Sequence, residues 1–477
     1  MKYNFFLPKM LLIALCIGIL GNCKNEIIED DTLPDPVDEI PVGTRVLPAY
    51  EQRSGDPDEG YDYLVNGDYI SSGIPYDIFL TAFGRDESNK LGRSGDNAVI
   101  NHEYTAVDAP NGVRVVAPNC LQCHASEING EFIVGLGNTQ ANFMDDQSDV
   151  LPIANAAIQF IYGSNSPEWE AYEPFAKAVE ATGPLLIVEN RGPNPADKIA
   201  AVLAAHRDRN SLVWQETPAV EIPEEVVPTD VPPWWILKKK NAMFYAAIGR
   251  GDFSRIMMSS SLLTMIDSTK AREVDHHFGD VLAYINSLEA PDYPFEIDQT
   301  LVAEGELVFK NNCAKCHGTY GDEETYPNLL VDIDVIQTDR TLSDIYQSEQ
   351  FTYFRNWINE GWFGQNPYAA ELVAEGGYVA PPLDGIWATA PYLHNGSVPT
   401  IADLLKSSDR PAYWRRSFDN SDYDPLKLGW NYTTENEKID DDTYDTTIPG
   451  YRNTGHSFGD VLTDGERKAL MEYLKTI

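Results

Sequence analysis

Basic residues are scarce in this sequence. Its 477 residues include 35 Lys and Arg against 74 Asp and Glu, which gives a formal net charge of -39. A protein that binds nucleic acid needs positive charge to displace counterions from the phosphate backbone. We therefore exclude nucleic acid as a partner and expect either a cationic partner or one that is not steered by charge.

Long apolar runs are also missing. The most apolar run, from Met10 to Leu20, is too short to cross a bilayer as a permanent helix. It follows a start that carries Lys2 and Lys9 and ends just before Cys23, which is typical of a cleaved export signal. We expect a signal peptide over residues 1–22 and an exported protein.

The residues up to Cys23 resemble a bacterial lipoprotein processing site, at which the cysteine is acylated and becomes the new N-terminus. Asn22 departs from the small residue that is usual before that cysteine. The acidic residues that follow resemble a tract that directs some Bacteroidota lipoproteins to the cell surface, although an ordinary acidic tether has the same composition. We expect lipid attachment at Cys23, an outer-membrane location, and membrane contact through this anchor only.

Cysteine is rare, and its placement is informative. Of six cysteines, Cys16 and Cys23 belong to the N-terminal segment, and the others fall in two Cys-x-x-Cys-His pentads, so that none remains for a disulfide. Two thiols at this spacing can form thioethers with the two vinyl groups of one haem, and the adjacent His then ligates the iron. The sequence therefore predicts two covalently attached haem c groups, held by Cys120, Cys123, His124, Cys313, Cys316 and His317.

A zinc knuckle or a thioredoxin-like motif is the alternative interpretation of each pentad. Zinc requires further paired Cys or His ligands, and neither motif requires a His directly after the second Cys. The presence of two complete pentads in an exported chain favours haem attachment.

Methionine is nearly absent after His317. Ordinary small electron carriers use a Met as the second axial ligand, but Met471 is the only one that follows, inside a predicted helix. The histidines that remain are His394 and His456, and His456 follows Gly455 in a loop before the last helix. We predict His456 as the distal ligand of the second haem, with His394 or an open site as the alternatives.

Helical periodicity organises the chain into domains. Apolar residues recur at helical spacing over 271–288, a helix over 300–309 leads into Cys313, and a final helix follows Thr463 or Asp464. The last two helices resemble the crossing pair of class I cytochrome c, with Phe309 against Tyr473. We expect an acidic, Pro-rich tether over 23–59, an N-terminal haem domain over 60–290 and a C-terminal cytochrome-c-like domain over 291–477.

The predicted fold class is mainly α: two cytochrome-c-like haem domains with long irregular loops and little β-structure. The loops over 378–400 and 409–450 are long for a compact domain. A haem can organise such loops, because its apolar faces need covering.

Several segments carry a family resemblance. The segment from Pro381 to Thr400 resembles the C-terminal domain of the di-haem rubber oxygenases, as do Arg410-Pro411, Tyr423-Asp424-Pro425 and Gly455-His456. Residues 234–240 and 249–252 look like the wider family, whose members are distant relatives of bacterial di-haem cytochrome c peroxidases. The resemblance covers most of residues 60–477 and is densest over 300–477.

This resemblance implies different roles for the two haems. The haem on His317, with His456 opposite, would be a low-spin electron-transfer centre. The haem on His124 would be five-coordinate or weakly capped and would handle oxygen or peroxide, which makes His124 the candidate catalytic residue. Trp234 or Trp235 is similar to the family's aromatic bridge between haems, although a packing anchor is an equally good interpretation.

Several residues could be the distal ligand of the first haem. Its iron could be capped by any of His102, His206, His276, His277, Met144, Met243, Met257 and Met258. Phe244, Tyr245 and Phe253 could wall the pocket, although aromatic residues at such spacing are usually core.

We therefore expect an exported di-haem cytochrome, a haem-dependent oxidoreductase of peroxidase or oxygenase type, which exchanges electrons with a redox partner protein or a small-molecule oxidant. A pure electron relay with both irons six-coordinate is one alternative. A non-catalytic surface binding protein, stapled by its haems, is another.

Overall fold

The first and last helices predicted for the second haem domain are present in the computed structural model, which describes residues 41–222 and 224–477. α9 (Gln299–Asn312) leads directly into Cys313, and α15 (Asp464–Leu474) lies near the end of the chain. Thr463 caps α15, because its hydroxyl accepts from the Glu466 N–H while the Glu466 carboxylate accepts from the Thr463 N–H.

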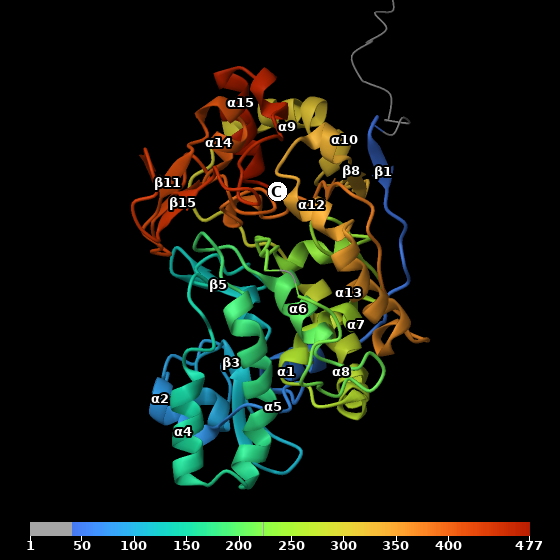
Figure 1. Ribbon diagram of the computed structural model, residues 1–477. Helices are drawn as coiled ribbons and strands as arrows, with labels where there is room; N and C mark the ends of the chain where they lie inside the picture. The colour runs from blue at the N-terminus through green and yellow to red at the C-terminus, as the bar shows by residue number, and fades with distance from the viewer. Residues whose placement is uncertain (1–40, 223) are drawn as a thin grey trace, which may run out of the picture. The chain divides into compact units, whose positions relative to one another are not determined.

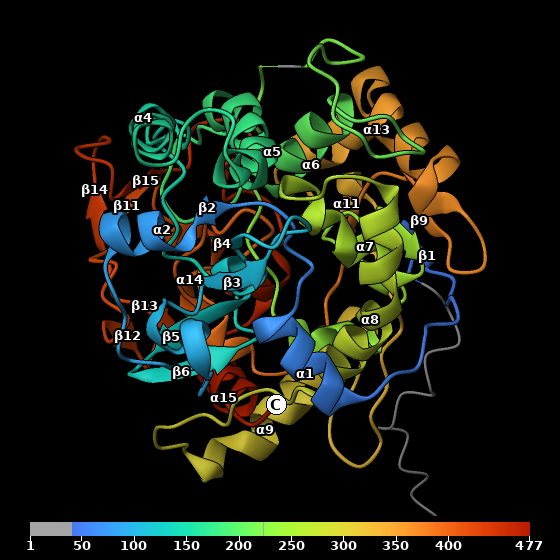
Figure 2. The ribbon, with the colours of Figure 1, turned by 90° about the horizontal axis from the view of Figure 1, so that it is seen from below.

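The predicted crossing of these two helices is confirmed. The ring centroids of Phe309 and Tyr473 lie 5.3 Å apart, and Figures 1 and 2 show α9 and α15 side by side. A Cβ on Gly305 would lie 2.0 Å from the carbonyl oxygen of Ala469, so the helices can approach this closely only because residue 305 has no side chain.

The helix predicted over 271–288 is confirmed as α8 (Ser268–Ser287), which packs against α1 (Pro57–Asn66). Asp267 caps α8 by accepting from the N–H groups of Thr269 and Lys270. The remaining α-helices are mostly short: α2 (Tyr76–Phe83), α3 (Leu121–His124), α4 (Leu151–Ile161), α5 (Pro167–Thr182), α6 (Ala196–Ala205), α7 (Phe253–Met258), α10 (Ala314–His317), α11 (Ile333–Ile336), α12 (Thr341–Tyr346), α13 (Glu349–Glu360) and α14 (Ile401–Leu404).

The predicted fold class is wrong. The described structure is 39% helical and 13% strand, with several small antiparallel sheets, and is therefore mixed α/β rather than mainly α with little β-structure. The strands, grouped by sheet, are β1 (Thr44–Val46), β8 (Leu329–Val331) and β10 (Tyr378–Val379); β2 (Ile74–Pro75), β4 (Arg114–Pro118) and β3 (Tyr104–Asp108); β5 (Ala125–Ile128) and β6 (Glu131–Val134); β7 (Gly249–Gly251) and β9 (Ala370–Leu372); β12 (Tyr423–Asp424) and β13 (Gly429–Trp430); β14 (Thr433–Glu435), β11 (Tyr413–Arg415) and β15 (Thr443–Asp445).

Local turns and backbone pairing explain these sheets. β5 and β6 form a hairpin through Asn129-Gly130, whose φ angles of 52° and 80° suit the two-residue turn that favours Asn-Gly. In the second half of the chain, β11, β14 and β15 lie within the segment 409–450, which was predicted to be a long loop, and β11 pairs with both of the other strands. This pairing satisfies backbone groups that an irregular loop would leave without hydrogen bonds.

Two adjacent tryptophans pack into different hydrophobic clusters. Trp234 lies in the cluster that includes Leu121, beside the first pentad, whereas Trp235 lies in the cluster that includes Phe309 and Tyr473. Both side chains are buried. The short helical segment η3 (Trp234–Lys239) therefore joins the core around the first pentad to the core around the second.

The described residues include only part of the segment for which the N-terminal predictions were made. The predicted signal peptide and Cys23 lie outside the described residues. Within the segment predicted as a tether, β1 pairs with β8. The domain boundary predicted near residue 290 stays a prediction. Over residues 41–222 and 224–477, no helix is long and apolar enough to cross a membrane.

Candidate functional site

The two pentads adopt the same helical turn. In α3 the backbone N–H of His124 donates to the Cys120 carbonyl at 3.1 Å, and in α10 that of His317 donates to the Cys313 carbonyl at 3.0 Å. Each turn places its two cysteines and its histidine on one short stretch of backbone. This is the arrangement that lets one haem bind two thiols and an imidazole.

The chemistry of the thiols does not favour the alternative interpretations of the pentads. Burial raises the pKa of all four, to about 11 for Cys123 and about 12 for Cys313. Zinc binding and thiol–disulfide exchange both use the thiolate, which a raised pKa disfavours. No three His, Cys, Asp or Glu side chains converge as a metal site within the described ranges, and a structural zinc site needs four ligands.

His317 is oriented by its own hydrogen bond. Its Nδ1 lies 2.8 Å from the carbonyl oxygen of Pro381, which fixes the proton on Nδ1 and leaves Nε2 free to bind a metal. Tyr320 supports the same loop, since its hydroxyl donates to the His317 carbonyl and accepts from the Leu383 N–H. Burial lowers the pKa of His317, so the neutral, ligating form is favoured.

His456 faces His317. The centroids of the two rings lie 6.2 Å apart, with the ring planes at 61°. A metal–imidazole bond of about 2 Å on each side, and about 1 Å from each ligating nitrogen to its ring centre, place two axial imidazoles about 6 Å apart. Burial lowers the pKa of His456 to about 3, with smaller effects from His317 and Arg410. The two imidazoles therefore fit opposite sides of one iron.

Arg410 holds the loop that carries His456. Its guanidinium donates to the carbonyl oxygens of Asn453, Gly455 and His456, and also to those of Asp403 and Leu404, at 2.6–3.1 Å. His456 has a φ of 43°, a conformation that few residues other than glycine adopt. The bonds of Arg410 contribute to holding the backbone in this conformation.

His394 has different neighbours. Its ring is buried and stacks on Tyr378 with centroids 4.2 Å apart, and its edge meets the ring of Tyr245. Burial lowers the pKa of His394 to about 4. The structure thus brings His456 to His317 and packs His394 among tyrosines.

The first pentad has a different environment. The ring of His124 stacks on Trp234 with centroids 4.6 Å apart and planes at 21°, and burial lowers its pKa to about 3. The side-chain amide of Asn194 donates to the Cys123 sulfur at 3.0 Å. Within the described part of the chain, Nδ1 of His124 is buried without a hydrogen-bond partner, whereas Nδ1 of His317 has the Pro381 carbonyl.

Three of the four histidines considered as caps for the first iron contact aromatic rings. His206 stacks on Trp214, His277 stacks on Tyr63, and His102 meets Phe132 edge-on. Met258 belongs to the large hydrophobic cluster that contains Trp234 and borders Cys120, and Met243 and Met257 pack against it.

Two of the three aromatic residues considered as a pocket wall, Phe244 and Tyr245, lie on a strained loop. Phe244 has a φ of 67° and Ala247 has a φ of 55°, and Phe244 packs against the same cluster as Trp234. Such backbone strain is concentrated at functional sites. Phe253 is instead a core residue at the start of α7, whereas the hydroxyl of Tyr245 donates to Asp230 at 3.2 Å.

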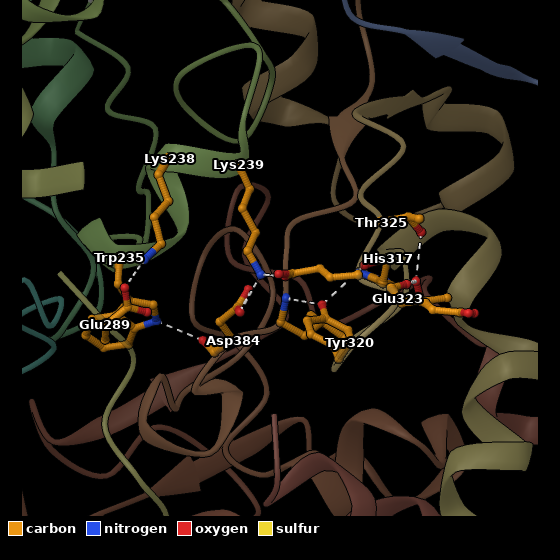
Figure 3. A network of polar contacts seen from close by, with 12 residues as sticks. Trp235, Lys238, Lys239, Glu289, His317, Tyr320, Glu323, Thr325 and Asp384 are labelled. Carbon is orange, nitrogen blue, oxygen red and sulfur yellow. Dashed lines mark hydrogen bonds and ion pairs between the residues drawn. The ribbon is translucent and has the colours of Figure 1, made fainter. Parts of the chain in front are cut away.

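A polar network links Trp235 to the second pentad (Figure 3). The Trp235 indole N–H donates to the carbonyl oxygen of Asp384 at 2.8 Å, and the ammonium of Lys239 pairs with the Asp384 carboxylate at 2.6 Å. Asp384 lies three positions after Pro381, the residue that orients His317. A path of packed and hydrogen-bonded groups therefore runs from His124 through the tryptophans to the loop beneath His317.

The sequence did not predict the parts that orient the ligands. Arg410 and Pro381 were visible only as members of a resembling motif, and Asn194 carried no signal. The available signal for Arg410 was an arginine before proline in an acidic chain, which alone does not show what the guanidinium binds. Backbone carbonyls as partners cannot be inferred from residue types.

Comparison with known proteins agrees with a haem protein. Residues 377–415 match a family described as RoxA-like, cytochrome c-like. This segment lies between His317 and His456 and includes His394. The match identifies a RoxA-like, cytochrome c-like part of the chain, which implies haem c and haem-based redox function.

Two proteins of Sinorhizobium fredii (strain NBRC 101917 / NGR234), both described as uncharacterized, are also similar. The protein y4iM is 27% identical over 312 residues, which cover 57% of this chain and 69% of y4iM. The protein y4iJ is 47% identical over 111 residues, which cover 21% of this chain and 18% of y4iJ.

Proposed function

We propose that this chain is an exported di-haem c-type cytochrome in which His317 and His456 hold an electron-transfer haem and His124 holds a haem that binds oxygen or peroxide. The observation that carries the proposal is the 6.2 Å separation of the His317 and His456 rings, which suits one iron between them. When bound, the haems supply electron transfer and oxidant binding.

Each histidine has a distinct role in this proposal. Pro381 holds the proton of His317 on Nδ1, which raises the basicity of the ligating nitrogen and fixes the ring. His456 closes the opposite side and excludes exogenous ligands. The imidazole of His124, stacked on Trp234, has no Nδ1 partner among the described residues, and three other histidines of its domain contact Trp214, Tyr63 and Phe132.

The packed path through Trp234 and Trp235 supports electron exchange between the two sites. Trp234 contacts the His124 ring, and Trp235 donates to the Asp384 carbonyl in the loop that orients His317. Met243, Met257 and Met258 share the hydrophobic cluster that borders Cys120, which favours a second candidate, a relay whose first iron is capped by sulfur.

Carbon monoxide distinguishes an open first haem from a capped one. The reduced protein should bind about one equivalent per chain, because His456 blocks the second iron. Loss of the first haem through the double variant Cys120→Ala, Cys123→Ala should abolish this binding. The matched variant His456→Ala should raise it to about two equivalents. The absence of binding to the wild-type protein would contradict the oxidant site and leave the relay.

A further inference from the structure

Arg416 is a buried cation without an anionic partner. It is 4% exposed, and its guanidinium forms no ion pair in the part of the chain that the structure describes. Nη2 donates to the carbonyl and the hydroxyl of Thr139, whereas Nη1 is buried without a hydrogen-bond partner among the described residues. The rings of Phe418 and Trp430 lie 4.1 Å and 4.7 Å from the central carbon of the guanidinium. A charge buried in this way costs several kcal/mol unless an anion compensates it.

The guanidinium lines a small cavity beside the first pentad, whose wall includes Thr139 and Pro193. Asn138, just before the first of these residues, donates its backbone N–H to the Cys123 carbonyl at 2.9 Å. Asn194, just after the second, donates its side-chain amide to the Cys123 sulfur at 3.0 Å. Consecutive Cα atoms are about 3.8 Å apart, so both wall residues lie one step from a residue that contacts Cys123. The cavity therefore adjoins the site at which the first haem is expected to be attached.

The charged groups that face this cavity do not neutralise Arg416. Arg191 brings a second guanidinium, and it already pairs with Asp442 at 2.9 Å. The carboxyl group of Asp230 accepts from the Tyr245 hydroxyl at 3.2 Å and makes no ion pair with Arg416 within the described ranges. Burial also raises the pKa of Asp230 to about 8, so this carboxyl is mostly neutral at pH 7. The wall thus presents an unpaired guanidinium N–H to an anion that the polypeptide does not supply.

Two side chains next to the cavity wall are also incompletely bonded. Both amide atoms of Gln140, which follows Thr139, and Oδ1 of Asn194 are buried without a partner in residues 41–222 and 224–477. Buried polar groups in proteins are normally hydrogen-bonded. Several unpartnered atoms beside one cavity therefore indicate a polar ligand from outside the chain.

We propose that Arg416 binds a propionate of the haem attached to Cys120 and Cys123 and raises the reduction potential of that haem. The inference rests on the proposed di-haem function, because the propionate is the carboxylate that the first haem would bring to the region around Cys123. An arginine suits this role, since its guanidinium stays charged and forms strong, directional hydrogen bonds with carboxylates. A fixed positive charge beside a haem stabilises the reduced state, which carries one more electron. Arg416 follows β11, so the second half of the chain would set the potential of the haem held by the first half.

The test is a redox titration of the full-length holoprotein, followed by the separate electron paramagnetic resonance signals of the two ferric haems. Arg416→Met should lower the midpoint potential of the first haem and leave that of the second unchanged. We expect at least a threefold change in the reduction equilibrium, about 28 mV at about 59 mV per tenfold for a one-electron couple. Arg416→Lys keeps the charge and should stay closer to the wild-type potential.

Arg250→Met is the matched control. Arg250 is equally buried, but it has its own carboxylate, Glu375, at 2.9 Å. Its loss removes one buried positive charge and should leave both potentials unchanged. An equal shift of the first midpoint in Arg250→Met and Arg416→Met would overturn the proposal.

The haem content separates the proposed function from the role of Arg416. A wild-type protein without two covalent haems by pyridine haemochrome assay and mass would contradict the proposed function itself. Two haems with unchanged potentials in Arg416→Met would overturn the role of Arg416 alone. Should Arg416→Met fail to fold, a crystal structure of the wild-type holoprotein decides. A propionate oxygen should lie about 3 Å from Nη1, and a water or a solute anion in its place would overturn the proposal.

Discussion

Arg410 offers a sharp test of how the second site is built, because it touches the backbone of His456 and not the ring. Arg410→Met removes donors to the carbonyls of Asn453, Gly455 and His456 while keeping much of the apolar stem. Each hydrogen bond contributes about 1 kcal/mol net, so three bonds amount to about 3 kcal/mol. That loss shifts the balance between the held and the released loop by about a hundredfold.

We expect the ferric Arg410→Met protein to show a mixture of low-spin and high-spin second haem in its optical and electron paramagnetic resonance spectra. Arg93→Met is the matched control, because Arg93 also donates to several backbone carbonyls, those of Val65, Tyr104, Ile100 and Asn101, far along the chain from His456. It should destabilise the protein without changing the spin state. A purely low-spin Arg410→Met, or equal spectra for both variants, would refute the role of Arg410.

Three further changes test other parts of the account. Gly305→Ala should lower the free energy of unfolding by about 2 kcal/mol or more in urea denaturation, because its Cβ would meet the Ala469 carbonyl; an unchanged midpoint would contradict the close helix crossing. Trp235→Phe should cost about 1–3 kcal/mol, because it leaves the Asp384 carbonyl without its donor; a cost near zero would show that this bond does not matter. Burial raises the pKa of Asp230 from 3.8 to about 8, so the folded state keeps a proton that the unfolded state loses, and the contribution of Asp230 to stability should fall as the pH rises from about 4 to 8. Asp230→Asn should lessen that fall by about 2–4 kcal/mol, measured as urea midpoints at pH 5 and pH 9, and equal pH dependence in both proteins would contradict the shift.

Periodicity and motif spacing predicted the helices at the second pentad well. The stripe of α8 and the capped start of α15 follow from local sequence, because helix formation depends on neighbours three and four positions away. The contact of Phe309 with Tyr473 was expected from the resemblance to class I cytochrome c. The small sheets were missed although Asn129-Gly130 is a strong hairpin signal. Strands of two or three residues, such as β12 and β13, give too short an alternation to detect.

Some residues of the candidate site could likewise be predicted from the sequence, and others could not. The thioether cysteines and proximal histidines can be predicted, because covalent attachment imposes a fixed spacing. The choice between His394 and His456 depends on which loop folds back over His317, and that is decided by Arg410 and by backbone carbonyls distant in sequence. Trp234 and Trp235 are adjacent in sequence yet enter different cores, a difference that residue type alone does not reveal.

The most direct measurement of the central claim is the low-temperature electron paramagnetic resonance spectrum of ferric His456→Ala. If His317 and His456 share one iron, the variant should convert one low-spin haem to high spin while its haem content stays unchanged. His394→Phe, which keeps a ring against Tyr378, should leave the spectrum as in the wild type. An unchanged spectrum in His456→Ala, or a new high-spin signal in His394→Phe, would contradict the assignment of His456 as the ligand opposite His317.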